Sequence, residues 1–577
     1  MSNLAFGIDL GTTNSAISCV LSGTFPTIIP VGVSGEKIMP SCVMWLGGDE
    51  FIVGEFAYEH FEQANVAHSF KRLIGSNEVI TLTYEGKSRD FTPVELSSLV
   101  LKELCKRVEG EYGKVERVVI TVPAYFTNDQ VAATREAGEL AGLEVLSTFR
   151  EPVSSALAYA VTHIEKFKFA SERYMVYDLG GGTFDVSIVE INKSIDYTPV
   201  DKFYGFDKLK TNTDDSAGIT LNVKGKYGDM LLGGDDIDEQ LVNATLARVK
   251  QQGYSVENLT ATCLRSIKHK CELFKKMAVQ GMKLRIELTY TDGREMQEVS
   301  AFISRDDLAE ATNVIYQRTQ SSEAKRTVRK ALGTHKLDGI LLIGGSTKND
   351  YIAEALKSDY PNVPLNRRLN PDEAVCLGAG LQANRLINGT SAIKVNDVLP
   401  LPIGVLVDGD KVFKILNKDS KVPTLGKYVF GTQEDNQDIA RIKVYQGNSS
   451  YARNSHFIGE LTIDNLPKGK AGEYPITVSL AVNLDGVLNC KATVNGETKT
   501  LTLANIFKGT KKEESKKETN TGKYNAMINR WKETANKQAR GEEILVAIKE
   551  YENGDIDFAT LLGRVSSMQN KIERPSK

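Results

Sequence analysis

The chain contains the stretch FGIDLGTTNS at residues 6–15 and the stretch YMVYDLGGGTFD at residues 174–185. Each has an apolar run typical of a strand, then Asp-Leu-Gly and a threonine, and an alternating run that predicts the second strand of a hairpin. The two aspartates, Asp9 and Asp178, are roughly 170 positions apart. This recurrence predicts a duplicated lobe, with one hairpin from each half facing a shared cleft.

The glycines of these two turns suit a phosphate ligand. At Gly11 and at residues 180–182 no side chain keeps backbone N–H groups away from phosphate oxygens, and the neighbouring threonine hydroxyls can donate to the same oxygens. Asp9 and Asp178 are then predicted to hold Mg²⁺, which keeps most of its waters and takes few protein carboxylates. One Asp-Leu-Gly turn is usually an ordinary turn, but two with matching flanks favour a nucleotide site.

A third glycine turn, Gly344-Gly-Ser-Thr347, follows the apolar run 339–343. A strand, a Gly-Gly turn and a helix in this order suit a base or a phosphate at a helix N-terminus, although the turn taken alone is equally an ordinary tight turn. Residues 93–108 and 129–141 have helical periodicity, so the predicted class is mixed α/β.

The sequence pattern of the chain changes near residue 395. Two prolines within 395–404 predict an extended connection, and short alternating runs from 403 to 503 predict an all-β sandwich. Residues 508–522 are charged and lack apolar side chains, and beyond them apolar residues recur at helical spacing. The predicted parts are therefore residues 1–393, a linker at 394–402, a β-sandwich at 403–505, and a charged linker with a short helical tail at 506–577.

Composition excludes several classes of protein. A net charge of −3 gives no basic surplus for nucleic acid. The seven cysteines are scattered without a Cys-x-x-Cys pair, so they predict free buried thiols in a reducing compartment. No room for a signal peptide precedes the first motif, and no run of about 18 apolar residues suits a bilayer. We therefore expect a cytoplasmic protein without nucleic-acid or membrane partners.

The motifs, taken in order, resemble those of the seventy-kilodalton heat-shock family of molecular chaperones (the DnaK- and HscC-like proteins). The resemblance runs from about Phe6 to Leu503 and also rests on further motifs: KRLIG at 71–75, VPAYF at 122–126, EP at 151–152, LGGDD at 232–236 and NPDEAV at 370–375. It implies an actin-like two-lobed ATPase domain, then a β-sandwich peptide-binding domain and a short helical lid. It also implies ATP or ADP with Mg²⁺ and a monovalent cation such as K⁺. The implied partners are unfolded or extended polypeptides, a J-domain co-chaperone and a nucleotide exchange factor.

The resemblance also implies roles for single residues. Lys71 would orient the attacking water and the γ-phosphate, although a lone lysine is usually a surface charge. Glu151 and Asp178 would position water and Mg²⁺, and Thr183 would contact the γ-phosphate; with Asp9 these form the catalytic set. The implied nucleotide contacts are Gly11, Thr12, Thr13, Asn14, Gly180, Gly181, Gly182, Gly233, Gly234, Glu272, Lys275, Lys276, Gly344, Gly345, Ser346, Lys348 and Asp372.

Two of these positions depart from the family pattern. Lys276 and Lys348 stand where the family has arginine. Lysine cannot stack a planar head on adenine as guanidinium does, so we expect weaker ATP binding than is usual in the family.

The β-sandwich departs from the pattern at its peptide pocket. Phe430 and Ile442 match pocket positions, whereas Ala440 replaces a larger aliphatic residue, and Asp408 and Gln433 stand at the arch above the pocket. These changes predict a larger pocket with an acid at its rim, and hence peptides with a bulky apolar residue and basic flanks. The alternative is that Asp408 points to solvent.

Three further departures bear on the coupling of the two domains. The linker is reduced to Asp397-Val398-Leu399 before a proline, and Val131 replaces an arginine at the contact between lobe and linker. An insertion of about 25 residues relative to the family lies within 192–229. We expect an ATP-driven chaperone that binds extended polypeptide. A non-cycling holdase or exchange-type relative is the alternative, and a sugar or acetate kinase is disfavoured by the β-sandwich.

Overall fold

The computed structural model describes residues 4–21, 25–32, 35–163, 167, 169–193, 218–257, 259–278, 281–291, 296–388, 393–483, 488–494, 497–502 and 548–549. The chain divides into two compact units, Met1–Phe507 and Lys508–Lys577. The predicted linker and helical tail at 506–577 therefore lie outside the described residues, apart from 548–549. In the described part of the chain, no helix is both long and apolar enough to cross a membrane.

The first central sheet is built on the N-terminal hairpin. Strands β1 and β2 pair antiparallel, β10 lies parallel to β1, and β11 lies parallel to β10. The order is β3-β2-β1-β10-β11, and β4 also pairs with β2. Its strands are β1 (Phe6–Leu10), β2 (Asn14–Cys19), β3 (Thr27–Ile28), β4 (Met39–Pro40), β10 (Arg117–Val122) and β11 (Glu144–Arg150).

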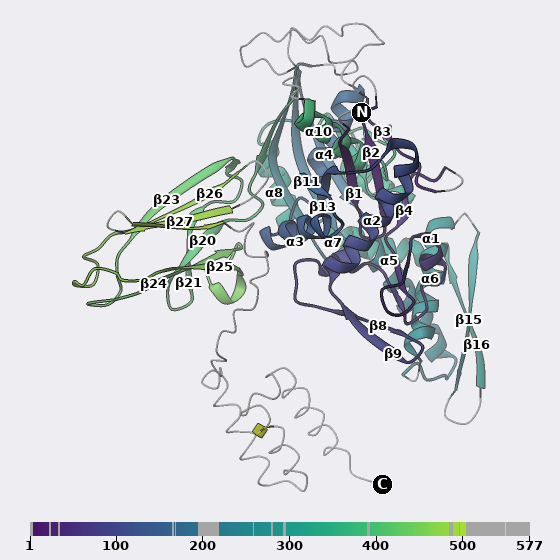
Figure 1. The fold of residues 1–577 in the computed structure, drawn as a ribbon. Helices are drawn as coiled ribbons and strands as arrows, with labels where there is room; N and C mark the ends of the chain where they lie inside the picture. The colour runs from purple at the N-terminus through teal and green to yellow at the C-terminus, as the bar shows by residue number, and fades with distance from the viewer. Residues whose placement is uncertain are drawn as a thin grey trace. The chain divides into compact units, whose positions relative to one another are not determined.

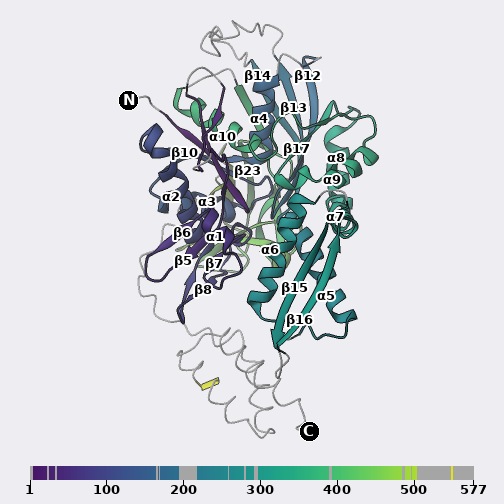
Figure 2. The ribbon, with the colours of Figure 1, turned by 90° about the vertical axis from the view of Figure 1, so that its right-hand side faces the viewer.

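The second central sheet repeats this arrangement. Its order β14-β13-β12-β17-β18 matches the order of the first sheet, again with an antiparallel hairpin and two parallel strands beside it. The predicted duplication of the lobe is thus present in the sheet topology (Figures 1 and 2). The strands are β12 (Ser171–Leu179), β13 (Phe184–Lys193), β14 (Ile219–Asp229), β17 (Gly339–Ile343) and β18 (Leu365–Asn366).

Two helices, α4 (Glu151–His163) and α10 (Ala374–Asn388), pack against each other and share one apolar core with both central sheets. Glycine permits this close packing. A Cβ atom at Gly378 of α10 would lie 1.9 Å from the carbonyl oxygen of Ser154 in α4. The two helices therefore join the lobes at the floor of the cleft.

The remaining elements of the lobes surround the sheets, with α2 and α3 near β10 and with α8 and α9 near β17 (Figure 2). The helices are α1 (Glu55–Glu59), α2 (Pro93–Tyr112), α3 (Asn128–Leu140), α5 (Gly234–Gln251), α6 (Ala261–Met277), α7 (Arg305–Thr319), α8 (Ser322–Leu332) and α9 (Asp350–Asp359), with short 3₁₀ helices η1 (Phe70–Leu73) and η4 (Gly345–Lys348). The smaller strands are β5 (Val43–Trp45), β6 (Phe51–Val53), β7 (Val66–Ala67), β8 (Ile80–Tyr84), β9 (Lys87–Phe91), β15 (Lys283–Thr291) and β16 (Met296–Ser304).

The predicted β-sandwich is present as two four-stranded antiparallel sheets that enclose one apolar core (Figure 1). Their orders are β21-β20-β24-β25 and β23-β26-β27-β28. The strands are β20 (Ile403–Asp408), β21 (Lys411–Leu416), β23 (Thr424–Phe430), β24 (Ala440–Gln446), β25 (His456–Ile463), β26 (Ile476–Val482), β27 (Leu488–Val494) and β28 (Glu497–Thr502); the 3₁₀ helix η5 (Ala452–Asn454) precedes β25. Residues 484–487, which connect β26 and β27, lie outside the described residues.

The predicted linker is not a free connection. Residues Ile393–Val398 form strand β19, which lies parallel to β14 at the edge of the second central sheet. The short strand β22 (Lys421–Val422) pairs with the end of β19. Of the predicted insertion within 192–229, β14 and the end of β13 are described, whereas 194–217 lie outside the described residues.

Candidate active site

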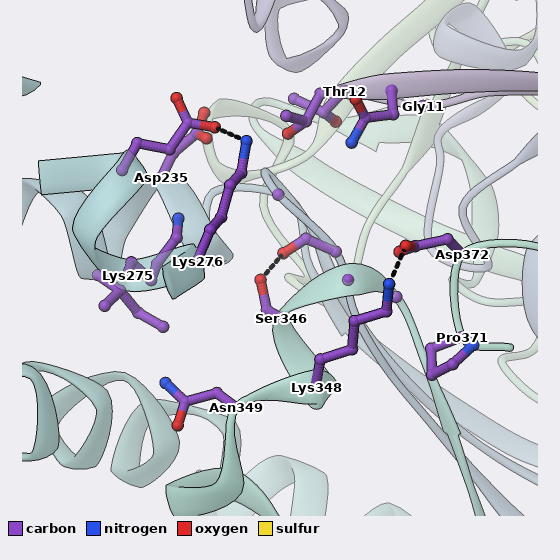
Figure 3. A pocket seen from close by; sticks show the side chains of 18 of the residues that line it. Gly11, Thr12, Asp235, Lys275, Lys276, Ser346, Lys348, Asn349, Pro371 and Asp372 are labelled. Carbon is purple, nitrogen blue, oxygen red and sulfur yellow. Dashed lines mark hydrogen bonds and ion pairs between the residues drawn. The ribbon is translucent and has the colours of Figure 1, made fainter. Parts of the chain in front are cut away.

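The two hairpins line one cavity of about 660 Å³ between the lobes. Most of the predicted site residues surround this cavity (Figure 3). They are Asp9, Gly11, Thr12, Thr13, Asn14, Lys71, Glu151, Asp178, Gly180, Gly181, Thr183, Glu272, Lys275, Lys276, Gly344, Gly345, Ser346, Lys348 and Asp372.

Three predicted nucleotide contacts, Gly182, Gly233 and Gly234, do not line the cavity. They instead hold the second hairpin. The carbonyl of Gly182 accepts a hydrogen bond from Arg72 Nε at 3.0 Å, and the backbone N–H of Gly234 donates to the carbonyl of Gly180 at 2.9 Å. A Cβ atom at Gly233 would lie 2.5 Å from the carbonyl oxygen of Gly181. These glycines therefore contact the turn of the second hairpin instead of lining the cavity.

A buried ion pair, formed by Lys71 and Glu151, lines the cavity. Lys71 Nζ donates to Glu151 Oε1 at 2.8 Å, and the two residues are only 3% and 8% exposed. Lys71 is the second residue of η1, which follows Ser69 in a left-handed conformation, and Glu151 begins α4 at the end of β11. Lys71 is therefore not a surface charge. A lysine buried to this depth needs a partner of opposite charge, because burial of an unpaired ammonium group is unfavourable. The pair therefore holds a cation at a fixed place inside the cleft.

Carboxylates gather around that pair. Burial and the charge of Glu151 raise the pKa of Asp9 to about 7, and the same causes raise the pKa of Asp178 well above its ordinary value. Burial and Glu151 also raise the pKa of Asp185 to about 8. Thr121 Oγ1 donates to Asp9 Oδ1 at 2.7 Å and fixes that carboxylate. A cation bound beside Asp9 and Asp178 would favour the ionised forms of these carboxyl groups.

These residues fit Mg²⁺ held together with phosphate. The hydroxyl of Thr13 is buried and has no hydrogen-bond partner among the described residues. In the same part of the chain, no three His, Cys, Asp or Glu side chains form a cluster that could hold a metal ion. Mg²⁺ is usually held by one or two carboxylates together with waters and phosphate oxygens. Asp9 and Asp178 would supply the protein's share, and the Thr13 hydroxyl would donate to a phosphate oxygen.

Contacts among the glycine turns and α6 shape the middle of the cavity. Ser346 Oγ donates to the carbonyl of Gly180 at 2.8 Å and so ties the third glycine turn to the second hairpin (Figure 3). Lys275 Nζ donates to Asp238 Oδ2 at 2.6 Å and to the carbonyl of Gly234 at 2.8 Å. The predicted third turn therefore lines the same cavity as the two hairpins and is not an isolated tight turn.

The two lysines at arginine positions are engaged by neighbouring side chains. Lys348 pairs with Asp372 at the cavity wall (Figure 3). Lys276 Nζ lies 2.7 Å from Glu272 Oε1 and donates to the hydroxyl of Tyr58 at 2.9 Å. Because Tyr58 belongs to the first lobe and Lys276 to the second, this contact crosses the cleft. The expected loss of guanidinium stacking on adenine stays a prediction.

Several cavity residues were missed by sequence reasoning. The wall beyond η4 includes Arg305 and Tyr351, and the guanidinium carbon of Arg305 lies 5.4 Å from the centre of the Tyr351 ring. Arg305 begins α7 and Tyr351 lies in the first turn of α9, so no local motif marks either residue. The other missed residues are Ser15, Ala16, Ile38, Asp235, Ile237, Met277, Ala278, Leu308, Asn349, Asp350, Pro371 and Val375.

A second cavity, of about 410 Å³, opens between the two sheets of the β-sandwich. Four of the predicted peptide-binding residues, Phe430, Gln433, Ala440 and Ile442, line it. Sequence reasoning missed its other residues: Val405, Leu406, Val407, Gly431, Gln437, Ile439, Arg441, Ile476 and Val478. Asp408 does not line the cavity: it is exposed at the end of β20, where it pairs with Lys411, which agrees with the alternative that this side chain points to solvent.

Glutamine side chains close the arch above this second cavity. Gln433 Nε2 donates to the carbonyl of Val407 at 2.6 Å, and the backbone N–H of Gln433 donates to Gln437 Oε1 at 2.7 Å. Gln437 Nε2 donates in turn to the carbonyl of Ile439 at 2.8 Å. The floor of the cavity is apolar and its arch is polar, which suits an extended peptide with an apolar side chain pointing inward.

Comparison with known proteins identifies one protein family that matches most of the chain. A family model described as Hsp70 protein matches residues 5–210 and 216–570. The chaperone protein DnaK of Mycoplasmoides gallisepticum (strain R(low / passage 15 / clone 2)) is 30% identical over 509 residues, which cover 87% of this chain and 80% of that relative. The family match extends over both central sheets and the β-sandwich. The chain therefore belongs to the Hsp70 family of ATP-binding chaperones.

Proposed function

We propose that this chain hydrolyses Mg²⁺-ATP in the cleft between its lobes and thereby changes the affinity of its β-sandwich for an extended polypeptide. The observation that carries the proposal is the buried pair of Lys71 and Glu151 among Asp9, Asp178 and the glycine turns. A relative that used nucleotide only to hold its shape would not need an ammonium group fixed inside the phosphate end. We therefore favour the hydrolysing chaperone over a non-cycling holdase.

The proposed reaction uses little covalent chemistry from the protein. Phosphoryl transfer to water depends mostly on positioning and charge neutralisation. Lys71 orients the attacking water and neutralises the γ-phosphate, while Glu151 holds the ammonium group and accepts a hydrogen bond from the water. Thr183 donates to the γ-phosphate from the second hairpin. Mg²⁺, when bound, supplies the remaining neutralisation of the phosphate oxygens.

The proposed peptide site is the 410 Å³ cavity. Main-chain hydrogen bonds from an extended peptide give affinity in sites of this kind, and the pocket for a side chain gives selectivity. J-domain and nucleotide-exchange partners are proposed on the family resemblance alone. Binding of a fluorescent extended peptide in the presence of ADP, followed by anisotropy, tests the site. A peptide without apolar residues serves as the control.

The pocket is expected to prefer aromatic over aliphatic central residues, because Ala440 leaves room at the floor. Ala440→Val adds two carbon atoms to the pocket. Burial of one such group contributes about 0.8 kcal/mol, and the added atoms take up space that an aromatic ring would otherwise fill. We expect this variant to weaken aromatic-centred peptides roughly tenfold and to leave leucine-centred peptides as they are or to strengthen them. Equal effects on both peptides would contradict the pocket argument.

The same peptide series tests the charge at the rim. Acidic residues Glu434, Asp435 and Asp438 are exposed on the loop that carries Gln433, and Asp408 is exposed beside Val407. Flanking lysine or arginine is expected to raise affinity by a modest factor that salt reduces. Asp408→Asn is expected to lower the gain in affinity that basic flanking residues give. An unchanged preference for peptides with basic flanks in that variant would show that Asp408 does not contribute to peptide binding.

A further inference from the structure

An arginine without a counter-ion lines the cavity between the lobes. Arg305 begins α7 and lies in the cavity wall together with Tyr351, which belongs to the first turn of α9. Among the residues that the structure describes, the guanidinium group of Arg305 makes no ion pair. The chemistry proposed above for the phosphate groups and Mg²⁺ makes no use of this residue.

The two lysines at arginine positions cannot supply what Arg305 offers. Lys348 and Lys276 each pair with a carboxylate, and an ammonium group has no planar face. A guanidinium group is planar, weakly hydrated and stacks on rings. Of the described residues that line the cavity, Arg305 is the one arginine.

The side chain of Tyr351 holds Arg305 in place. The guanidinium carbon of Arg305 lies 5.4 Å from the centre of the Tyr351 ring, a distance at which a cation and an aromatic face attract each other. The Tyr351 hydroxyl also donates to the backbone carbonyl of Arg305 at 3.3 Å. These two contacts tie the first turn of α9 to the start of α7.

Asn349 fixes the same corner of the cavity, which it also lines (Figure 3). Its Oδ1 accepts the backbone N–H of Tyr351 at 3.0 Å, and its Nδ2 donates to Thr312 Oγ1 of α7 at 2.9 Å. Both polar atoms of this amide are therefore engaged within the protein. Arg305 and Tyr351 are thus arranged before a ligand enters, which lowers the entropic cost of binding.

The lining beside Arg305 suits a flat ring. Leu308 follows it on α7, and Met277 and Ala278 lie at the end of α6; all three line the cavity. Apolar side chains with a few placed polar groups are typical of sites for organic ligands. A nucleotide whose phosphates lie at the two hairpins has its base elsewhere in this 660 Å³ cavity, and this lining fits the base.

We infer that Arg305 stacks on the purine base of the bound nucleotide and that Tyr351 positions Arg305 for this contact. One face of the guanidinium group meets the Tyr351 ring, and the other face meets the base. Such stacking combines cation–π attraction with exclusion of water from two flat surfaces. The chain thus obtains from α7 the guanidinium contact that Lys276 and Lys348 do not provide. This inference rests on the proposed binding of Mg²⁺-ATP in the cleft.

Calorimetric titration of the full chain tests the contact with two ligands, Mg²⁺-ATP and Mg²⁺-tripolyphosphate, which lacks the base and the ribose. Arg305→Met removes the cation, whereas Arg305→Lys keeps the charge and removes the planar face. We expect both variants to bind ATP about tenfold more weakly than the wild type. Binding of tripolyphosphate should stay within about twofold, because Arg305 does not contact the phosphates. Arg329→Met, at an exposed position of α8 outside the cavity, is the matched control.

Two variants of Tyr351 test its positioning role. Tyr351→Leu removes the ring behind the guanidinium group and should weaken ATP binding about threefold. Tyr351→Phe keeps the ring and should bind ATP within about twofold of wild type. In all variants the single-turnover rate at saturating Mg²⁺-ATP should remain near that of the wild type, because the groups assigned to the reaction are unchanged. Thermal unfolding without nucleotide identifies variants that fail to fold, and Arg305→Lys keeps the test decisive where Arg305→Met does not fold.

Three results would overturn the inference: wild-type affinity for ATP in the Arg305 variants, full affinity in Arg305→Lys alone, or equal losses for ATP and tripolyphosphate. The second result would assign a charge effect and the third a phosphate contact. Failure of the proposed function has a different signature, because calorimetry needs no turnover. A wild type that binds ATP through Arg305 without hydrolysing it would contradict the proposed hydrolysis and leave the inference in place.

Discussion

Lys71→Ala is expected to reduce single-turnover hydrolysis of ATP by a factor on the order of 10²–10³, as for other groups that stabilise charge in a transition state. The reason is the position of the ammonium group: it is 3% exposed and held by Glu151 at 2.8 Å, at the end of the cleft where the carboxylates gather. Binding of ATP should survive, because the glycine turns and the cavity residues on α6 and η4 remain unchanged. Rapid-quench hydrolysis and calorimetric binding measure the two quantities separately.

The control for this experiment addresses folding. Removal of Lys71 leaves Glu151 unpaired in a buried place, which costs several kcal/mol if the carboxylate stays ionised. Thermal unfolding of the variant is therefore measured beside that of Lys114→Ala, in which a lysine with 73% of its side chain exposed is removed. A folded Lys71→Ala variant that hydrolyses ATP at the wild-type rate would contradict the role in positioning water.

Asp178→Asn is expected to lower the rate of hydrolysis by about 10²-fold or more, because it removes one of the two carboxylates that fit Mg²⁺. The substitution keeps the shape of the side chain and removes a charge from a cluster in which burial and Glu151 already raise the pKa of Asp178. Binding of ATP without Mg²⁺ should be unchanged or tighter, since one negative charge fewer faces the phosphates. Binding of ATP with Mg²⁺ should weaken.

Titration with Mg²⁺ in the two proteins separates this expectation from a general defect. The rate of the wild type should rise to saturation and fall to background with excess chelator, and the variant should need a higher Mg²⁺ concentration for any residual rate. Asp49→Asn, at a side chain that is 96% exposed, serves as the control. An Asp178→Asn protein with the same Mg²⁺ dependence and rate as wild type would remove Asp178 from the metal site.

The sequence predicted the lobes well because their signals are local and repeated. The hairpins around Asp9 and Asp178 carry glycines and threonines at fixed offsets, and the matching strand orders follow from that repetition. The β-sandwich was predicted from alternation of apolar residues, although β23 shows this alternation poorly. Residues Thr424–Phe430 are exposed at several apolar positions, so the strand does not show a clean alternation of buried and exposed residues.

The parts of the site that sequence reasoning missed depend on contacts between distant segments. Arg305 and Tyr351 come from two helices that meet only in the fold, and the pairing of Lys226 with Asp397 joins residues 171 positions apart. Lys226 has no local motif, and Asp397 was interpreted only as part of a shortened linker, so the linker was predicted as an extended connection. The structure instead gives it a strand partner and a buried counter-ion.

The proposed control of peptide affinity in the β-sandwich by ATP in the cleft is tested most directly by the release rate of a bound fluorescent peptide. The complex is formed with ADP, an excess of unlabelled peptide and either Mg²⁺-ATP or Mg²⁺-ADP is added, and anisotropy is followed in time. We expect ATP to accelerate release at least tenfold, a typical coupling between two sites, in both the wild type and Lys71→Ala, because in the proposed cycle ATP binding lowers the affinity for peptide and hydrolysis restores it. Equal release rates with ATP and ADP in the wild type would contradict the claim.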